Sequence, residues 1–215
     1  MDRYENIDYI KHKYAQKKKQ IQLRIQDFQN VFLLGNDAYF SEMIFCICAA
    51  NSKARSAFVA QKLIEKKGIW KIDQKSISEI LLKSKVRFHN NKARYIVSAR
   101  AHLFLERNFD RYMKEAKNEF EMRDILAKNV LGLGMKESSH FLRNIGYSKN
   151  TAILDRHILK NLKKYSVISE IPKTLTKTRY IEIEKKMNEF SDKIEILSSH
   201  LDLLFWSEQT GEILK

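Results

Sequence analysis

Lys136 and Asp155 are the two residues whose types and spacing indicate chemistry. Lys136 directly follows the glycine hairpin Leu131-Gly132-Leu133-Gly134, and Asp155 comes nineteen residues later. An ε-amine in the first turn of a helix, partly withdrawn from water, has its protonated form disfavoured by the helix dipole and by desolvation. A neutral lysine is a nucleophile that can form a Schiff base. The position of Lys136 therefore suggests covalent catalysis. With 40 Lys+Arg in the chain, the alternative is a solvated surface lysine.

Asp155 stands immediately before Arg156-His157-Ile158-Leu159, where a helix is expected to start. This position predicts that the Asp155 side chain is the N-cap of that helix. A carboxylate held at a helix N-terminus is oriented and kept ionised. It can then stabilise a cationic sugar or steer a proton, so the structural and the chemical roles of Asp155 are compatible.

The hairpin around Gly132 and Gly134 separates two amphipathic segments. We expect both glycines to adopt backbone conformations that other residues reach only at a steric cost, so that a tight turn joins two helices. Outward-facing N–H groups of the turn, with the positive end of the helix that begins near Lys136, would bind a phosphate oxygen. A helix-hairpin-helix grips one DNA strand in this way without reading its sequence. The simpler alternative is a helix C-cap followed by a turn.

The composition indicates a polyanionic partner. The formal net charge is +14 and the sequence pI is about 9.6, which favours a nucleic acid or an anionic membrane. The longest apolar run, Met43 to Ala50, is eight residues, and no signal peptide opens the sequence, which predicts a cytoplasmic protein that does not enter a membrane. With 215 residues and 44% hydrophobic content, residues 1–215 can form a single domain, either as one body or as two closely packed lobes.

Cysteine usage limits the cofactors. Cys46 and Cys48 are the only two cysteines, and they lie two positions apart in an apolar run. On a helix they would point to different sides, so we expect buried free thiols without a disulfide. Two cysteines also cannot ligate a tetranuclear iron–sulfur cluster. No cofactor is expected.

The secondary structure is predicted to be all-α. Glycine is scarce, Pro172 is the single proline, and several segments repeat apolar residues at helical spacing, for example Ile125-Leu126-Val130. Breaks are expected at 35–37, 68–73, 107–110, the hairpin, 146–151 and 169–173. The pattern predicts the helix-hairpin-helix at about 123–146, the Asp155 loop and helix at about 150–164, and a C-terminal tail at about 200–215. The lysine run 11–19 is expected on the solvent-exposed face of the first helix.

These motifs resemble a known family. The stretch Val130–Lys136 followed by Ala152–His157 is similar to the helix-hairpin-helix DNA glycosylases with a Gly/Pro-rich loop and a catalytic aspartate. Gly134–Tyr147 looks more closely like the type 2 8-oxoguanine DNA glycosylase/AP lyases of archaea and some bacteria. Further matching segments, which carry the resemblance from about residue 30 to the last residue, are Ala49–Ser52, Val86–Phe88, Lys92–Val97 and Trp206–Lys215. Two features depart from the pattern: Leu131 replaces the hairpin proline, and the lysine-rich N-terminal segment looks unspecific.

The resemblance implies a fold and a reaction. The fold would be two packed helical lobes with the active site in the cleft between them. The enzyme would be a bifunctional DNA N-glycosylase and AP lyase, acting as a monomer on double-stranded DNA that contains an oxidised base. Lys136 would displace 8-oxoguanine and form a Schiff base, Asp155 would stabilise the cationic sugar, and β-elimination would cut the abasic strand. Neither a cofactor nor a catalytic metal would be needed.

The resemblance also assigns residues to DNA. Asn51 would fill the gap that an extruded nucleotide leaves in the duplex. Its alternatives are an N-cap of the helix that begins at about Lys53 and a polar turn residue. Arg55 and Arg87 would hold the opposite strand or base. Residues Lys128, Val130 and Leu133 would supply backbone carbonyls to a structural monovalent cation.

The base pocket is implied by residues near the C-terminus. Trp206 would stack on the extruded base, and Lys215 would bring the terminal carboxylate or backbone to its polar edge. At helical spacing, the alternative for Trp206 is a place in the core. His140, one turn after Lys136, would line the same cleft. The aromatic residues Phe88, Tyr95 and Phe141 are expected in the core.

Two other functions stay open on the sequence. One is an enzyme of the same fold that acts on an oxidised pyrimidine or a mismatch. The other is a non-catalytic helix-hairpin-helix protein in which Lys136 only contacts a phosphate. Lys136 favours lyase chemistry over the second function, but it does not select a purine.

Backbone recognition predicts a strong dependence of duplex affinity on salt. If about four phosphates are neutralised, affinity should fall roughly 100-fold between about 50 and 200 mM salt, because binding releases condensed counterions. A fluorescence-anisotropy titration of a labelled duplex measures this slope. Affinity that does not change with salt would contradict the model of a backbone grip.

Overall fold

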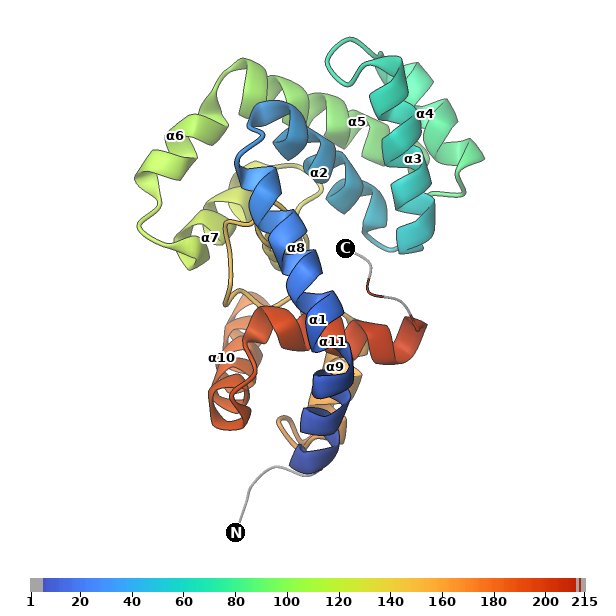
Figure 1. Ribbon diagram of the computed structural model, residues 1–215. Helices are drawn as coiled ribbons and strands as arrows, with labels where there is room; N and C mark the ends of the chain where they lie inside the picture. Colours follow the sequence, from blue (N-terminus) through green and yellow to red (C-terminus); the bar gives the residue numbers. More distant parts are fainter. Residues whose placement is uncertain (1–5, 212, 214–215) are drawn as a thin grey trace.

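A computed structural model describes residues 6–211 and 213, and every regular element in them is helical (Figure 1). The prediction of an all-α chain is confirmed for this part of the protein. None of the described helices combines the length and the apolar character that crossing a bilayer requires. In chain order the elements are α1 (Ile7–Phe32), α2 (Asn36–Ala49), α3 (Ala54–Lys67), α4 (Gln74–Lys83), α5 (His89–Ala99), the π-helical segment η1 (Arg100–Leu105), α6 (Asn108–Glu115), α7 (Glu119–Asn129), α8 (Met135–Asn144), α9 (Arg156–Lys164), α10 (Lys177–Ile194) and α11 (Ser198–Thr210).

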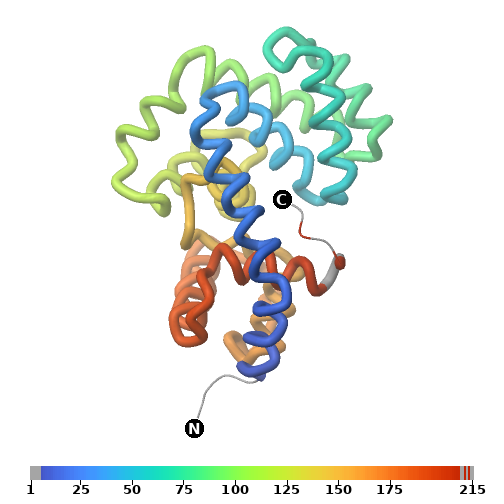
Figure 2. The backbone as a smooth tube through the Cα atoms, in the orientation of Figure 1, coloured from blue at the N-terminus to red at the C-terminus, as the bar shows by residue number. Residues whose placement is uncertain are grey.

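The helices form two lobes, each with its own core. The first lobe contains α2 to α8, and its core extends from Phe40 to Ile145. The second lobe contains α9 to α11 and most of α1, with residues such as Ile21 and Leu204 buried among them. Helix α1 runs along both lobes and contacts α2, α8 and α11 (Figure 2). The expectation of two packed helical lobes is therefore confirmed.

Helix α2 is the centre of the first lobe. It packs against α3, α5 and α8, and its residues from Phe40 to Cys48 are all buried. Cys46 and Cys48 are free thiols inside this core, as expected. Burial raises the pKa of the Cys48 thiol to about 12, so it stays protonated at neutral pH. The apolar run in the sequence is thus a buried core helix.

The hairpin between α7 and α8 needs its first glycine for two reasons. Gly132 has a φ of +85°, and a Cβ atom there would lie 2.4 Å from Cδ2 of Tyr95. The expectation for Gly134 is wrong, because its φ of −95° is open to any residue. A Cβ at Gly134 would only approach the Glu137 carboxylate, at 3.2 Å. The N–H groups of the turn were also expected to face outward. The Leu133 N–H does not, because it donates to the Val130 carbonyl within the turn.

A buried ion pair connects the hairpin region to the second lobe. Arg123 of α7 donates to both carboxylate oxygens of Glu184 of α10, at 2.5 and 2.6 Å. Glu184 also accepts a hydrogen bond from the Ala152 N–H at 2.7 Å. The Tyr180 hydroxyl donates to the Ala152 carbonyl and accepts the Leu154 N–H. Burial raises the pKa of Glu184, and Arg123 opposes this shift. The segment that leads to Asp155 is therefore held on both sides of its backbone.

A second buried pair joins α8 to α11. The Arg143 guanidinium donates to the Asp202 carboxylate, and it lies over the ring of Phe28 of α1. Burial raises the pKa of Asp202 to about 6; Arg143 opposes this shift and the nearby Asp155 carboxylate adds to it. This pair holds the C-terminal helix against the helix that carries Lys136.

Replacing Gly132 with alanine should destabilise the fold more than the same change at Gly68. Both glycines have a left-handed φ, +85° and +90°, but nothing lies within 4 Å of a Cβ at Gly68. Each substitution should cost about 1–2 kcal/mol for the backbone conformation. Gly132→Ala should cost about 1–3 kcal/mol more, because its methyl group overlaps Tyr95. Urea unfolding of the two variants measures the difference, and equal unfolding free energies would show that the contact with Tyr95 is not a constraint.

Asp202 should contribute a pH-dependent term to stability. Its pKa is higher in the folded chain than the ordinary 3.8, so the folded state holds the proton more tightly than the unfolded state. That contribution is complete below about pH 4 and is lost as the pH rises to about 6. Relative to Asp202→Asn, which cannot titrate, the unfolding free energy of the wild type should fall over this window. Chemical unfolding at several pH values tests this, and a difference that grows with pH would mean that Arg143 dominates over burial.

Candidate active site

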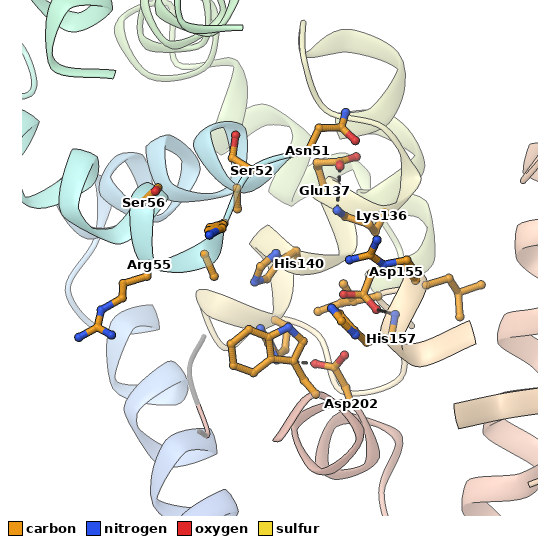
Figure 3. A pocket seen from close by; sticks show the side chains of 18 of the residues that line it. Asn51, Ser52, Arg55, Ser56, Lys136, Glu137, His140, Asp155, His157 and Asp202 are labelled. Carbon is orange, nitrogen blue, oxygen red and sulfur yellow. Dashed lines mark hydrogen bonds and ion pairs between the residues drawn. The ribbon is translucent and has the colours of Figure 1, made fainter. Parts of the chain in front are cut away.

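A cavity of about 1060 Å³ opens between the two lobes. Its walls come from the turn between α2 and α3, the segment before α5, the start of α8, the Asp155 loop with the start of α9, and α11 (Figure 3). Segments that are distant in the sequence thus meet at one place. The predicted residues that line this cavity are Asn51, Arg55, Arg87, Lys136, His140, Asp155 and Trp206.

Lys136 is the second residue of α8 and reaches into the cavity with its side chain 29% exposed. Its amine forms an ion pair with Oε1 of Glu137 at 3.2 Å, and the Gly134 N–H donates to Oε2 at 3.3 Å. One carboxylate therefore contacts both the lysine and the hairpin. Glu137 was not predicted from the sequence, although an acidic residue three positions after a helix N-cap is a recognisable capping pattern.

Asp155 is the N-cap of α9, as predicted. Its Oδ1 accepts the backbone N–H groups of His157 and Ile158, at 2.7 and 2.8 Å. The carboxylate is half-buried and borders the same cavity as Lys136 (Figure 3). The helix start therefore orients an anionic group toward the space in front of the lysine.

The wall of the cavity opposite the α2–α3 turn is built by α11. Trp206 lines the cavity and is only partly buried, whereas Leu204 and Phe205 lie in the core. The alternative of a core position for Trp206 is therefore wrong. His140 follows Lys136 by one turn and sets its ring edge-on to Phe45. Lys215, the other predicted pocket residue, lies outside the described residues.

The turn between α2 and α3 presents Asn51 to the solvent at the rim. Asn51 is exposed with a φ of +53°, and the N-cap of α3 is Lys53, so the alternative of an N-cap role for Asn51 is wrong. Arg55 also borders the cavity, but its side chain points away from Lys136 (Figure 3).

The segment before α5 forms the neighbouring part of the rim. Arg87 is exposed, and its guanidinium lies 5.3 Å from the centre of the Phe88 ring. Phe88 is 54% exposed with a φ of +59°, so the expectation of a core position is wrong for this residue. Phe141 is fully buried as expected, and the partly buried Tyr95 packs beneath the hairpin.

Gly132 and Gly134 lie in the hairpin and not in the wall of the cavity. The suggested cation site at the carbonyls of Lys128, Val130 and Leu133 stays a prediction. The Val130 carbonyl already accepts one hydrogen bond, from the Leu133 N–H at 3.2 Å.

Two further residues of the cavity wall were not predicted from the sequence. Asp202 borders the cavity on the same helix as Trp206 and is paired with Arg143 (Figure 3). His157 follows Asp155 by two residues, and its Nδ1 is buried without a partner among the described residues. The signal in the sequence that could have found His157 is its position two residues after the predicted N-cap, Asp155.

Comparison with known proteins identifies the fold and the family. A family model described as 8-oxoguanine DNA glycosylase matches residues 21–196. An 8-oxoguanine DNA glycosylase/AP lyase of Fusobacterium nucleatum is 36% identical over 219 residues, covering 100% of both chains. The likeness therefore includes the lysine-rich N-terminal segment, which looked unspecific in the sequence. A relative of the same name from Methanocaldococcus jannaschii is 37% identical over 94% of this chain and 95% of its own.

Solved structures agree with this assignment. The M. jannaschii 8-oxoguanine glycosylase/lyase in complex with a 15mer DNA containing 8-oxoguanine has a TM-score of 0.88 and 36% identity, covering 97% of this chain and 99% of that chain. The 8-oxoguanine DNA glycosylase of Thermotoga maritima has a TM-score of 0.87 and 30% identity, covering 97% and 98%. These similarities confirm the expected helix-hairpin-helix glycosylase fold, and the chain belongs to the 8-oxoguanine DNA glycosylase family.

Proposed function

We propose that this chain removes 8-oxoguanine from double-stranded DNA and then cleaves the abasic strand by β-elimination. One observation carries the proposal: Lys136 and Asp155 face the same cavity between the lobes, with Trp206 on its wall. Relatives over the whole chain are named for both activities, and a similar structure holds DNA containing 8-oxoguanine. An amine, a fixed carboxylate and an aromatic wall are the parts that this reaction requires.

Lys136 is the nucleophile of the proposed reaction. Its ammonium must first lose a proton, and Glu137, 3.2 Å away, can accept it. The neutral amine attacks C1′ of the deoxyribose, and the bond from C1′ to the base breaks with its electron pair on the base. Asp155 stabilises the positive charge that develops on the sugar. The two N-cap hydrogen bonds fix the orientation of this carboxylate at the edge of the cavity.

Strand cleavage follows from the same intermediate. The sugar ring opens to give a Schiff base between Lys136 and C1′. Loss of a proton from C2′ then expels the phosphate on C3′ with the electrons of the C3′–O bond. Hydrolysis of the imine by water releases Lys136 and the cut strand. Both steps pass through the bond between Lys136 and C1′, so one lysine serves both activities.

Access to the buried nucleotide requires the rim of the cavity. Extruding a base costs a few kcal/mol, and a side chain must fill the gap in the stack. Asn51, exposed on the turn between α2 and α3, is our choice for this plug. Arg87 and Arg55 would contact the opposite strand. The hairpin at Gly132 and Gly134 would bind a phosphate, which must compete with Glu137 for the Gly134 N–H.

The base itself would lie against α11. Trp206 offers an aromatic face for stacking, and His140 also lies on the cavity wall. Lys215, which lies outside the described residues, stays the proposed partner for the polar edge of the base. We further propose that the protein acts in the cytoplasm as a monomer, as one domain over residues 1–215. Its partner is then the oxidised duplex alone.

Borohydride trapping tests the nucleophile and the substrate together. Wild type should form a covalent adduct on a duplex with one 8-oxoguanine, and not on an undamaged guanine duplex, because only the lesion is excised to give the imine. Lys136→Gln should abolish the adduct and retain duplex binding. Lys53→Gln and Lys85→Gln, which remove the other lysines of the cavity wall, should still form it. Denaturing gels measure the adduct.

Each other outcome rejects a specific part of the proposal. Trapping on an oxidised-pyrimidine duplex in place of 8-oxoguanine would retain the mechanism and reject the substrate. An adduct that persists in Lys136→Gln would reject the nucleophile. No adduct on any duplex would leave a DNA-binding protein without lyase chemistry.

A further inference from the structure

Lys92 is a buried cation beside the cavity that the proposed reaction does not use. It lies on α5 with 4% of its surface exposed, and it does not line the cavity. Its Nζ donates to the Cys48 carbonyl at 2.8 Å, to the Ala50 carbonyl, and to Oγ of Ser52 at 3.0 Å. Three acceptors match the three protons of an ammonium group. All three belong to the end of α2 and the turn that contains Asn51.

The same hydroxyl connects a second loop. Oγ of Ser52 also accepts the backbone N–H of Arg87 at 3.0 Å. The turn with Asn51 and the segment with Arg87 and Phe88 are therefore linked through Ser52 and anchored by Lys92. These two loops form neighbouring parts of the cavity rim that we assign to the DNA duplex.

Both loops adopt conformations that need external support. Asn51 and Phe88 are not glycines, yet their φ angles are +53° and +59°. Left-handed residues of this kind persist only where the surrounding structure holds them. Asn51 and Phe88 are also exposed, so burial of their own side chains supplies little of that support. Backbone hydrogen bonds support both loops, from the Ser52 N–H to the Ala49 carbonyl and from the Lys92 N–H to the Phe88 carbonyl. Side-chain support comes from the Lys92 ammonium, which donates to the Ala50 carbonyl and to Ser52, and from the Ser52 hydroxyl, which accepts the Arg87 N–H.

The protonated form of Lys92 is disfavoured by its surroundings. The pKa of Lys92 is lowered to about 8, mainly by burial; Cys48 and Glu137 oppose this shift, and the positive charges of Lys136 and Arg87 add to it. Near neutral pH the group is an ammonium with three donors. Above about pH 8 it becomes a neutral amine with two, which leaves one of the three acceptors without its proton.

We propose that Lys92 is a positioning residue for base extrusion, because it holds the Asn51 turn and the Arg87–Phe88 segment in the arrangement that meets the duplex. Lys92 acts through these loops and touches neither the base nor the sugar. This inference rests on the role of Asn51 in the proposed function. It predicts a separation of the two activities, since base removal from a duplex needs extrusion and cleavage of a single-stranded abasic site does not.

Lys92→Met should impair one activity and retain the other. The methionine side chain has a similar length and no donor, so excision of 8-oxoguanine from a duplex should fall about 10- to 100-fold in kcat/KM. Cleavage of a single-stranded abasic oligonucleotide should stay within about twofold, because it depends on Lys136 alone. Arg94→Met removes an exposed cation from the same helix and is the matched control, which should leave the ratio of the two activities unchanged.

The pH profile separates positioning from a general loss of structure. In the wild type, the ratio of duplex excision to single-strand cleavage should fall as the pH rises through about 8, because Lys92 loses a proton. Taking the ratio cancels any pH dependence that the two reactions share. In Lys92→Met the ratio should be low and independent of pH. A wild-type ratio that is flat across this range would overturn the proposal.

A double-mutant cycle with Asn51→Ala distinguishes the failure of this inference from failure of the proposed function. If Asn51→Ala alone does not impair duplex excision, the plug assignment in the proposed function is wrong. If it does, Lys92→Met should add little in that background, because both changes remove the same step. Fully additive losses would overturn the role of Lys92 and leave the plug intact. Equal loss of excision and of single-strand cleavage in Lys92→Met would overturn it too, since that indicates a disturbed core.

Discussion

The buried pair of Arg123 and Glu184 is the contact on which the geometry of the site depends. The two side chains are 2% and 4% exposed and belong to different lobes, so their ion pair sets how the lobes meet. The Glu184 carboxylate also accepts a hydrogen bond from the N–H of Ala152, three residues before Asp155. Removal of either partner would leave an uncompensated charge in the interior, which is strongly destabilising. The position of Asp155 relative to Lys136 is therefore secured by a residue pair that lies outside the cavity.

Glu137 connects two functional groups at the start of α8. Its carboxylate contacts the amine of Lys136 and the Gly134 amide of the hairpin at the same time. The capping of the helix and the placement of Lys136, our proposed nucleophile, thus depend on one side chain. A DNA phosphate at the hairpin would meet a backbone amide that is already engaged. The chemistry and the backbone grip of this enzyme are consequently physically connected.

The rim of the cavity is organised differently from its floor. The floor consists of helix ends and buried ion pairs, whose geometry follows from close packing. The rim consists of exposed loops with left-handed residues, including Asn51 and Phe88, which are held by polar contacts from Lys92 and Ser52. Such loops can present side chains to DNA without the support of a core. This arrangement keeps the buried cation Lys92 close to the like charge of Lys136, which we propose as the nucleophile.

The sequence by itself determined the features that depend on short-range patterns. Helical periodicity predicted the all-α architecture, and an aspartate before an amphipathic segment predicted the N-cap at Asp155. The hairpin and Lys136 could also be located, because their meaning lies within a few residues. Gly134 and Phe88 were misjudged, since a glycine does not reveal its φ and an aromatic side chain does not reveal its burial.

Only the tertiary structure decided which charges are paired. The chain has 40 cations and 26 anions, and no local pattern selects Arg143 with Asp202 or Lys92 with the carbonyls of the α2 end. These contacts join residues that are far apart in the sequence, and they form because the fold brings buried polar groups within reach of one another. A buried charge must find a partner, and the fold determines which one it finds.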